Sequence, residues 1–277
     1  MVGKTCFIAD LDGTLLHKSQ KHLCPSSENK IAIQEYIAAG NLFVIATGRG
    51  YKEVEEVCKN LEIEMPFVIA QNGALLYENG VELASKMLES DIILEVKDFI
   101  KNSKAKIDYF AVTTDDWNMH IIPLSLAGYL VYSKYKKTNK KKYQRIHISK
   151  IPVLAADKKR FCKILLFARG KQISMIEQEL RENFSERLSI YCSSTYSVEI
   201  CAENVGKERA IEQLLTKACI DPKKVGFVGD SGNDVGAFKY FEKTYAMSHA
   251  PEKYRQFAKY TVKSVAEAIA EFKKDEE

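Results

Sequence analysis

The residues best suited to chemistry in this chain lie directly after its apolar runs. Asp10 and Asp12 follow the first of these runs, Thr47 follows a second, and Asp230 follows another much later in the sequence. Short apolar runs that stop abruptly at polar or glycine residues are typical of strands buried on both faces of a parallel sheet. Because the carboxyl ends of such strands meet at one edge, where ligands bind, we expect these side chains to share one site.

Carboxylates gathered in this way need a counter-charge. Asp10, Asp12, Asp230 and the nearby Asp234 would repel one another unless a cation or a proton intervened. A hard divalent ion relieves that repulsion, and Mg²⁺ suits a site that offers few protein carboxylates together with phosphate and water. We therefore expect a Mg²⁺ site in which a carboxylate oxygen remains free to attack phosphorus, the chemistry of phosphoryl transfer through an aspartyl phosphate.

The same segments carry groups that bind phosphate. Thr14 and Thr47 offer hydroxyl groups, while Gly13 and Gly48 allow the backbone to approach a phosphate closely. Lys207, at the start of a predicted helix, adds a positive charge beside backbone donors. Taken singly, an aspartate after a strand is commonly a turn residue or a helix cap. That explanation is much weaker for the whole set than for any one member.

The order of the elements predicts how these residues are positioned. Strand-like and helix-like segments alternate near both ends of the chain, whereas the middle is less regular. We expect an α/β fold with a doubly wound, mostly parallel sheet built from residues 1–84 plus 196–277, the catalytic core. Residues 85–195 are expected to form an inserted α+β domain.

Composition argues against several classes of protein. The net charge of +4 is too small to imply a nucleic-acid partner, and the 7 cysteines are scattered singly, without the spacing of a disulfide framework or a zinc site. We see neither a secretory signal nor an apolar run long enough to span a membrane. We expect a reducing cytoplasm as the location, with no membrane, nucleic acid or obligate protein partner.

Four ordered segments resemble the motifs of the haloacid dehalogenase (HAD) superfamily. They are residues 10–14 (Asp-Leu-Asp-Gly-Thr), residues 47–49 (Thr-Gly-Arg), Lys207, and residues 229–234 (Gly-Asp-Ser-Gly-Asn-Asp). Residues 72–74 and 246–247 resemble the Cof-type sugar-phosphatase branch in particular. The resemblance implies a HAD-like Rossmannoid core and a cap domain that closes over the site and excludes water.

The resemblance also implies roles for single residues. Asp10 would be the nucleophile and a Mg²⁺ ligand. Asp12 would be the general acid for the leaving group and then the base for the attacking water, with its backbone carbonyl on the metal. Asp230 would be the second carboxylate on Mg²⁺, and Asp234 would hold a metal-bound water or Lys207.

A further group is implied to bind the substrate. Its members are the hydroxyl group of Thr47, the amides of Leu11 and Gly48, and the side chains of Asn72, Lys207 and Asn233. Thr47 and Lys207 are counted among the catalytic residues as well. All of these roles rest on the resemblance and are expectations.

Several positions have an open interpretation. Glu208 and the pair Ser248-His249 depart from residues common in this branch, and His249 lies either near the phosphate site or in an ordinary structural position. The basic stretch 134–150 attracts an anionic substrate or a nucleic acid, or it is a solvated loop or helix face of the cap. Trp117, at a predicted hairpin tip, either stacks on a leaving group or is part of a plain turn.

The expected activity is Mg²⁺-dependent hydrolysis of small phosphorylated metabolites, sugar phosphates above all, through a phosphorylated Asp10. Flavin mononucleotide, pyridoxal phosphate and nucleotides are alternative substrates. A phosphomutase with a related core is another alternative, for which we find no supporting feature. A silent phosphate-binding regulatory protein is disfavoured because both Asp10 and Asp12 are present.

Overall fold

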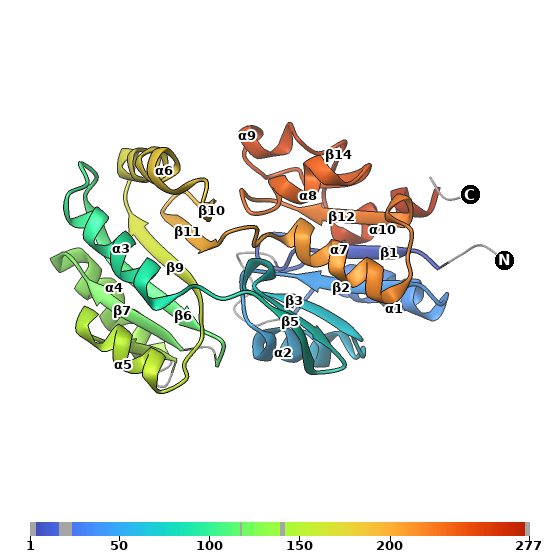
Figure 1. Ribbon diagram of the computed structural model, residues 1–277. Coiled ribbons are helices and arrows are strands. Elements are labelled where there is room, and N and C mark those ends of the chain that lie inside the picture. The colour runs from blue at the N-terminus through green and yellow to red at the C-terminus, as the bar shows by residue number, and fades with distance from the viewer. Residues whose placement is uncertain (1–3, 17–23, 117, 139–141, 275–277) are drawn as a thin grey trace. The chain divides into compact units, whose positions relative to one another are not determined.

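The computed structural model describes residues 4–16, 24–116, 118–138 and 142–274 of the 277-residue chain. The chain divides into two compact units, Met1–Ser85 with Gly206–Glu277 and Lys86–Val205. Trp117 and residues 139–141 of the basic stretch lie outside the described residues. Each unit is built around its own sheet (Figure 1).

The first unit contains an eight-stranded sheet with the order β14-β13-β12-β1-β2-β3-β4-β5. Its strands are β1 (Cys6–Ala9), β2 (Leu42–Ala46), β3 (Phe67–Ala70), β4 (Leu75–Glu78), β5 (Val81–Ser85), β12 (Val225–Gly229), β13 (Lys243–Met247) and β14 (Tyr260–Val262). The strands from β14 to β3 are parallel, and β4 and β5 form an antiparallel edge. The sheet is mostly parallel, as predicted.

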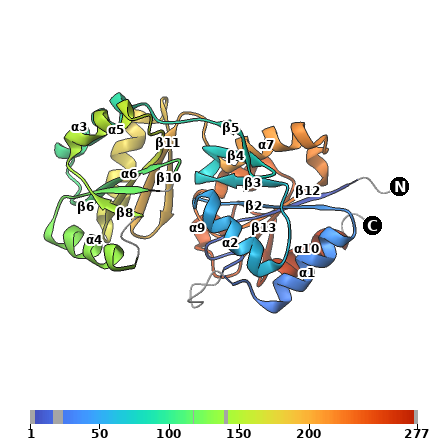
Figure 2. The same cartoon turned by 90° about the horizontal axis from the view of Figure 1, so that it is seen from below.

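Helices cover both faces of this sheet, so that it is doubly wound (Figure 2). They are α1 (Ser27–Ala38), α2 (Tyr51–Leu61), α7 (Lys207–Ala218), α8 (Val235–Tyr240), α9 (Glu252–Arg255) and α10 (Val265–Lys274). α1, α2 and α10 pack against the face that carries Phe7 and Phe43, whereas α7 and α8 pack against the face that carries Ile8 and Val44. Strand residues therefore alternate between two apolar cores, which explains their continuous apolar runs.

Local signals set the ends of these elements. The Ser26 hydroxyl accepts a hydrogen bond from the Asn29 amide at 3.2 Å and so caps α1. Gly40, with φ of +85°, follows the helix end and turns the chain towards β2. Asn79 and Gly80 both have positive φ in the tight turn between β4 and β5.

The second unit contains a six-stranded sheet with the order β10-β11-β9-β6-β7-β8. Its strands are β6 (Ile107–Thr114), β7 (Met119–Pro123), β8 (Tyr143–Arg145), β9 (Phe161–Ala168), β10 (Leu188–Ser194) and β11 (Ser197–Ala202). All pairs are antiparallel except β7 with β8. Its helices are α3 (Ser90–Lys101), α4 (Leu126–Thr138), α5 (Ile151–Ala156) and α6 (Lys171–Phe184).

The second boundary between the units differs from the expected one. We expected residues 196–277 in the core, but β11 pairs with both β10 and β9 of the inserted sheet. Residues 196–205 therefore fold with the second unit, which ends at Val205. The physical reason is that β11 completes an antiparallel ladder, and the sequence of a six-residue strand does not by itself reveal which sheet it joins.

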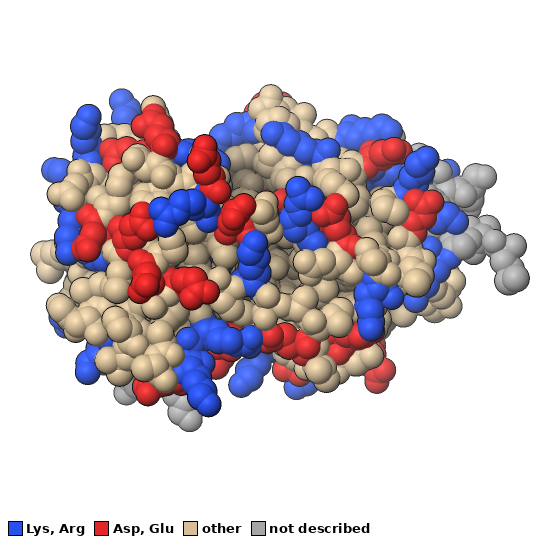
Figure 3. Space-filling model, viewed as in Figure 1, with Lys and Arg blue, Asp and Glu red and all other residues tan. Residues whose placement is uncertain are grey.

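The surface is mixed in charge over the face shown in Figure 3, where lysine and arginine side chains are interspersed with aspartate and glutamate. Within the described segments, none of the helices has both the length and the apolarity that crossing a bilayer requires.

His120 on β7 makes the stability of the second unit depend on pH. Its side chain is 3% exposed, and neither ring nitrogen has a hydrogen-bond partner among the described residues. Burial lowers the pKa of His120 below the ordinary value of 6.5, although Asp116 opposes the shift. As the pH falls below the ordinary value, the unfolded chain gains a proton at this ring before the folded chain does, so the free energy of unfolding decreases.

We expect His120→Phe to lose less stability than the wild type between about pH 7 and about pH 5, because it removes this proton uptake. Urea unfolding at both pH values measures the difference. His147→Phe is the matched control, since His147 is exposed, and should retain the wild-type pH dependence. An equal loss of stability in His120→Phe and the wild type would contradict the interpretation.

Candidate active site

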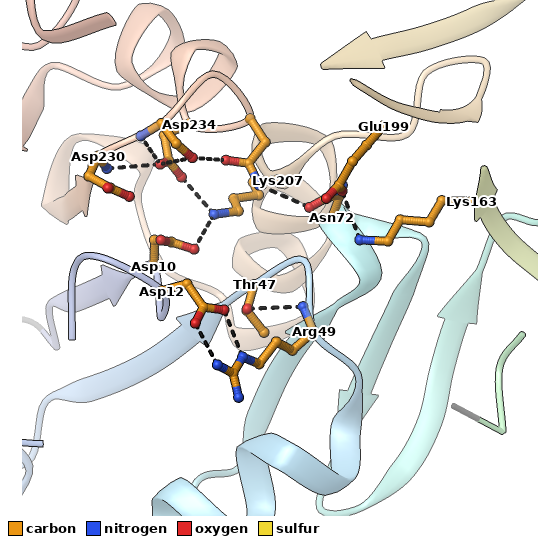
Figure 4. Close-up of polar contacts among 12 residues, drawn as sticks. Asp10, Asp12, Thr47, Arg49, Asn72, Lys163, Glu199, Lys207, Asp230 and Asp234 are labelled. Carbon is orange, nitrogen blue, oxygen red and sulfur yellow. Dashed lines mark hydrogen bonds and ion pairs between the residues drawn. The ribbon is translucent and has the colours of Figure 1, made fainter. Parts of the chain in front are cut away.

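The parallel sheet brings the sequence-predicted residues to one edge. Asp10 follows β1, Thr47 follows β2, and Asp230 follows β12, and these three strands are neighbours in the sheet. Lys207 is the first residue of α7, and Asp234 directly precedes α8. Figure 4 shows their side chains converging. The juxtaposition predicted from the strand ends is therefore found.

Lys207 lies at the centre of this group. Its Nζ atom lies 2.5 Å from Oδ1 of Asp10 and 2.6 Å from Oδ1 of Asp234. The Lys207 side chain is 0% exposed, and both aspartates are buried. Burial by itself lowers the pKa of Lys207, but the two carboxylates outweigh burial and hold that pKa above its ordinary value. The lysine is therefore charged at neutral pH.

The carboxylates outnumber this one lysine. Asp10, Asp230 and Asp234 are all buried, and each offers an oxygen within 4.8 Å of the others. Burial raises the pKa of Asp10, the charges of Asp234 and Asp230 raise it further, and Lys207 opposes the rise. Three buried carboxylates beside one ammonium group leave an excess of negative charge. Oxygen ligands of this kind fit a hard divalent cation such as Mg²⁺.

Asp234 also fixes the loop that carries Asp230. Its Oδ2 atom accepts hydrogen bonds from the amides of Asp230 and Ser231, each at 2.9 Å. Gly229 packs so closely that a Cβ atom there would lie 2.4 Å from Cγ of Asp234. A single carboxylate thus holds Lys207 with one oxygen and the loop with the other, which sets the direction of the Asp230 side chain.

Gly13 is required on the opposite side of Asp230. It has φ of +84°, and a Cβ atom at this position would lie 2.3 Å from Oδ2 of Asp230. Both the backbone conformation and the space therefore exclude a larger residue. This contact explains why a glycine follows Asp12 in the first motif.

Asp12 points away from the buried cluster. Its Oδ2 atom accepts a hydrogen bond from Nε of Arg49 at 2.7 Å, and its Oδ1 atom accepts one from Nη2 at 2.5 Å. The Asp12 side chain is 57% exposed, so solvent reaches it. The expected contact of its backbone carbonyl with a metal stays a prediction. No role of Arg49 was predicted from the sequence, although the residue completes the Thr-Gly-Arg segment.

The expected phosphate-binding groups surround the same edge. Thr47 is buried, and its hydroxyl accepts the Arg49 amide at 3.1 Å. The amides of Leu11 and Gly48 belong to the loops directly after β1 and β2. Thr14 is also buried, and its hydroxyl has no hydrogen-bond partner within the described ranges.

Asn233 and Asn72 form a buried pair at this edge. Nδ2 of Asn233 donates to Oδ1 of Asn72 at 3.0 Å, and the Ser231 hydroxyl donates to Oδ1 of Asn233 at 2.6 Å. Asn72 adopts a left-handed conformation with φ of +61°, which places its side chain in a short turn after β3. Ser231, like Arg49, was quoted in a motif but not assigned to the site.

The departures from the family pattern have definite places in the structure. Nε2 of His249 lies 3.7 Å from Oδ2 of Asp230, so this histidine lies beside the acidic cluster. Glu208 packs its carboxylate against two glycines, because a Cβ atom on Gly206 or Gly236 would lie 2.4 or 2.3 Å from one of its oxygens. α7 still begins at Lys207, so Glu208 does not alter the start of the helix.

The second unit carries a buried ion pair of its own, also drawn in Figure 4. Nζ of Lys163 on β9 lies 2.7 Å from Oε2 of Glu199 on β11, and the Ser193 hydroxyl donates to Oε1 of Glu199 at 2.9 Å. Removing two charges from water is costly, so such a pair is weak evidence for stability. None of these three residues was predicted from the sequence to have a role.

Comparison with known proteins places this arrangement in a family. A model of the haloacid dehalogenase-like hydrolases matches residues 7–272. The 5-amino-6-(5-phospho-D-ribitylamino)uracil phosphatase YwtE of Bacillus subtilis (strain 168) is 26% identical, over 94% of this chain and 93% of its own. A putative phosphatase of Mycoplasma pneumoniae is 24% identical, over 92% of this chain and 89% of its own.

Solved structures are similar in fold. SMU.1108c from Streptococcus mutans UA159 has a TM-score of 0.80 at 19% identity and covers 99% of both chains. The HAD subclass IIB sugar phosphatase BT4131 has a TM-score of 0.77 at 17% identity, over 98% of this chain and 99% of its own. Since the family model spans nearly the whole chain and the relatives are named as phosphatases, the chain belongs to the haloacid dehalogenase-like hydrolases, in their Cof-type branch, as a phosphoric monoester hydrolase.

Proposed function

We propose that this chain hydrolyses small phosphorylated metabolites with Mg²⁺, by transferring the phosphoryl group to Asp10 and then to water. The observation that carries the proposal is the buried cluster in which Lys207 bridges Asp10 and Asp234 beside Asp230. Burying several charges together lowers the free energy of unfolding, and such clusters are typical of sites that bind a ligand or catalyse a reaction.

Asp10 and Asp230 are the residues that would hold Mg²⁺. Asp234 supports them by fixing Lys207 and the Asp230 loop, and the backbone carbonyl of Asp12 is an additional candidate ligand. When bound, the ion supplies positive charge that stabilises the transferring phosphoryl group. The uncompensated negative charge of the cluster supports this assignment.

Asp10 and Asp12 divide the chemistry between them. A carboxylate oxygen of Asp10 forms a bond to phosphorus as the bond to the leaving oxygen breaks, and Asp12 gives its proton to that oxygen. The Asp12 carboxylate then removes a proton from the water that attacks the aspartyl phosphate, which releases phosphate and restores Asp10. Their surroundings support these roles, because the proposed nucleophile Asp10 is buried and the proposed acid and base Asp12 is exposed.

Arg49 controls the availability of Asp12 in this proposal. The guanidinium group engages both carboxylate oxygens, so Asp12 cannot reach a leaving group until the pair separates. A phosphate dianion binds guanidinium through the same pair of donors and would compete with Asp12. We propose that the substrate phosphate draws Arg49 away, so that the Asp12 carboxylate takes up a proton from solvent and can then act as the acid.

The phosphate would be bound by groups that surround the cluster. These are the hydroxyl group of Thr47, the amides of Leu11 and Gly48, and the side chains of Lys207, Asn72 and Asn233. The Asn233–Asn72 hydrogen bond supports a shared role by fixing the orientation of both amides. We propose the second unit as the cap domain of the enzyme.

The substrate class follows from chemistry and from the relatives. One relative is named for a phosphorylated ribitylamino compound, and one similar structure is a sugar phosphatase. Phosphate monoesters of sugars and of related polyols are therefore the first substrates to test, with flavin mononucleotide, pyridoxal phosphate and nucleotides as alternatives.

We expect Asp10→Asn to lower kcat for an aryl phosphate by about a thousand-fold or more, because an amide cannot serve as the nucleophile. Asp91→Asn is the matched control, since Asp91 is exposed on α3, and should keep wild-type activity. A chelator should abolish wild-type turnover, and added Mg²⁺ should restore it. Wild-type turnover by Asp10→Asn, or no hydrolysis across the substrate panel by the wild type, would refute the proposal.

Lys207→Met leaves Asp10 and Asp234 buried without their ammonium partner. We expect the free energy of unfolding to fall by about 3–5 kcal/mol, the usual cost of removing one member of a buried pair. Urea unfolding measures this loss. Lys217→Met on the same helix is the control; its side chain is half-exposed 3.6 Å from Glu78, and the change should be close to zero. Equal stability of Lys207→Met and Lys217→Met would contradict the account.

Arg49→Met should lower kcat/KM by about ten- to a hundred-fold, with the larger effect on KM, because the variant loses a phosphate-binding group. Steady-state kinetics with an aryl phosphate measure both constants. Arg209→Met removes an exposed arginine that pairs with Glu212 and should leave them unchanged. An unaltered KM in Arg49→Met would argue against a phosphate contact.

A further inference from the structure

One segment of the second unit is far more basic than the rest of the chain. Residues 117–156 contain eight lysines and arginines and no aspartate or glutamate, which gives this segment a charge of +8. The whole chain has a net charge of +4, so all other residues together carry −4. α4 and β8 form much of this segment.

The outer side of α4 is apolar in its first two turns. Leu126, Tyr129 and Leu130 follow the spacing of one helix face, and they are 78%, 43% and 62% exposed. The inner side is apolar as well, because Tyr132 packs against Tyr109 of β6 and other residues of the sheet. A helix that is apolar on both sides is ordinarily covered on both sides. Large exposed apolar side chains that cluster in this way indicate an interaction site.

Basic side chains adjoin the apolar ones. Lys134, Lys136 and Lys137 are exposed in the last turns of α4. Arg145 of β8 lies over the ring of Tyr129, with its Cζ atom 5.4 Å from the ring centre, and so joins the charged and apolar parts. We call Leu126, Tyr129, Leu130, Lys134, Lys136, Lys137 and Arg145 the α4 surface.

The nearby acidic group does not offset this charge. Asp108 of β6 accepts a hydrogen bond at 2.7 Å from the hydroxyl of Ser125, the residue that precedes α4. Its other oxygen lies 2.9 Å from Nε of Arg169, so its charge is compensated within the unit. The α4 surface therefore offers its positive charges to a partner.

We propose that the α4 surface docks this protein onto an anionic lipid bilayer, a property beyond the proposed hydrolysis. Leu126 and Leu130 would enter the interface while the lysines pair with lipid headgroups, the combination found in interfacial amphipathic helices. A second copy in two-fold contact would bring like charges together. A nucleic acid would pair its phosphates with the lysines but would leave Leu126 and Leu130 exposed to water. This contact is peripheral and requires no membrane-spanning helix.

The test is co-sedimentation of the full chain with lipid vesicles. One set contains phosphatidylcholine alone, and the other contains phosphatidylcholine mixed with an equal amount of phosphatidylglycerol. We expect binding to the second set only, and we expect added salt to weaken it because surface charges are screened.

Two variants separate the charged and the apolar contributions. Lys134→Gln/Lys136→Gln/Lys137→Gln should weaken vesicle binding by roughly a hundred-fold, about five-fold for each lysine. Leu126→Ser/Leu130→Ser should weaken it by about ten-fold or more for each leucine. The matched controls alter exposed residues of the first unit, Lys223→Gln/Lys253→Gln/Lys263→Gln and Val81→Ser, and should bind as the wild type does. Hydrolysis of a soluble aryl phosphate and thermal unfolding report whether each variant is folded.

Three outcomes would overturn the proposal. They are no binding to the anionic vesicles, equal binding to both vesicle compositions, and equal loss of binding in the α4 and control variants. Binding of single-stranded RNA that depends on the lysines but not on the leucines, without vesicle binding, would assign the surface to nucleic acid instead.

Discussion

The ion pairs of Lys207 are the interaction on which the site depends. An ammonium group and two carboxylates are held together without solvent, on elements that come from opposite ends of the chain. Their mutual attraction offsets the cost of burial only while all three are present. The contact therefore fixes the first residue of α7 against the end of β1 and the start of α8.

The parallel sheet and its glycines make this contact possible. Adjacent strands deliver Asp10 and Asp230 to one edge, and Gly13 and Gly229 allow the close approach of the Asp230 and Asp234 carboxylates without a clash. Asp234 uses its second oxygen to hold the loop amides. These constraints leave a cluster with excess negative charge, and its oxygen ligands fit a hard divalent cation.

Features that depend on a short run of neighbouring residues were predicted correctly from the sequence. The buried strands β1, β2, β3 and β12 are continuous apolar runs, and the polar residues that follow them must meet if the strands are parallel. Features that depend on which distant segment or side chain a residue contacts were not predicted. β11 was placed in the core because nothing in its own residues distinguishes its neighbours. The Asp12–Arg49 pair was missed because the direction of an exposed side chain depends on three-dimensional packing.

The central claim is that the buried cluster exists to make Asp10 a phosphoryl acceptor, and mass spectrometry tests it most directly. Wild-type enzyme is mixed with a sugar phosphate and Mg²⁺, quenched in acid during turnover and digested. The account predicts a phosphoryl group on the peptide that contains Asp10, at the Asp10 side chain. Steady formation of phosphate with no phosphorylated Asp10 at any quench time would contradict it.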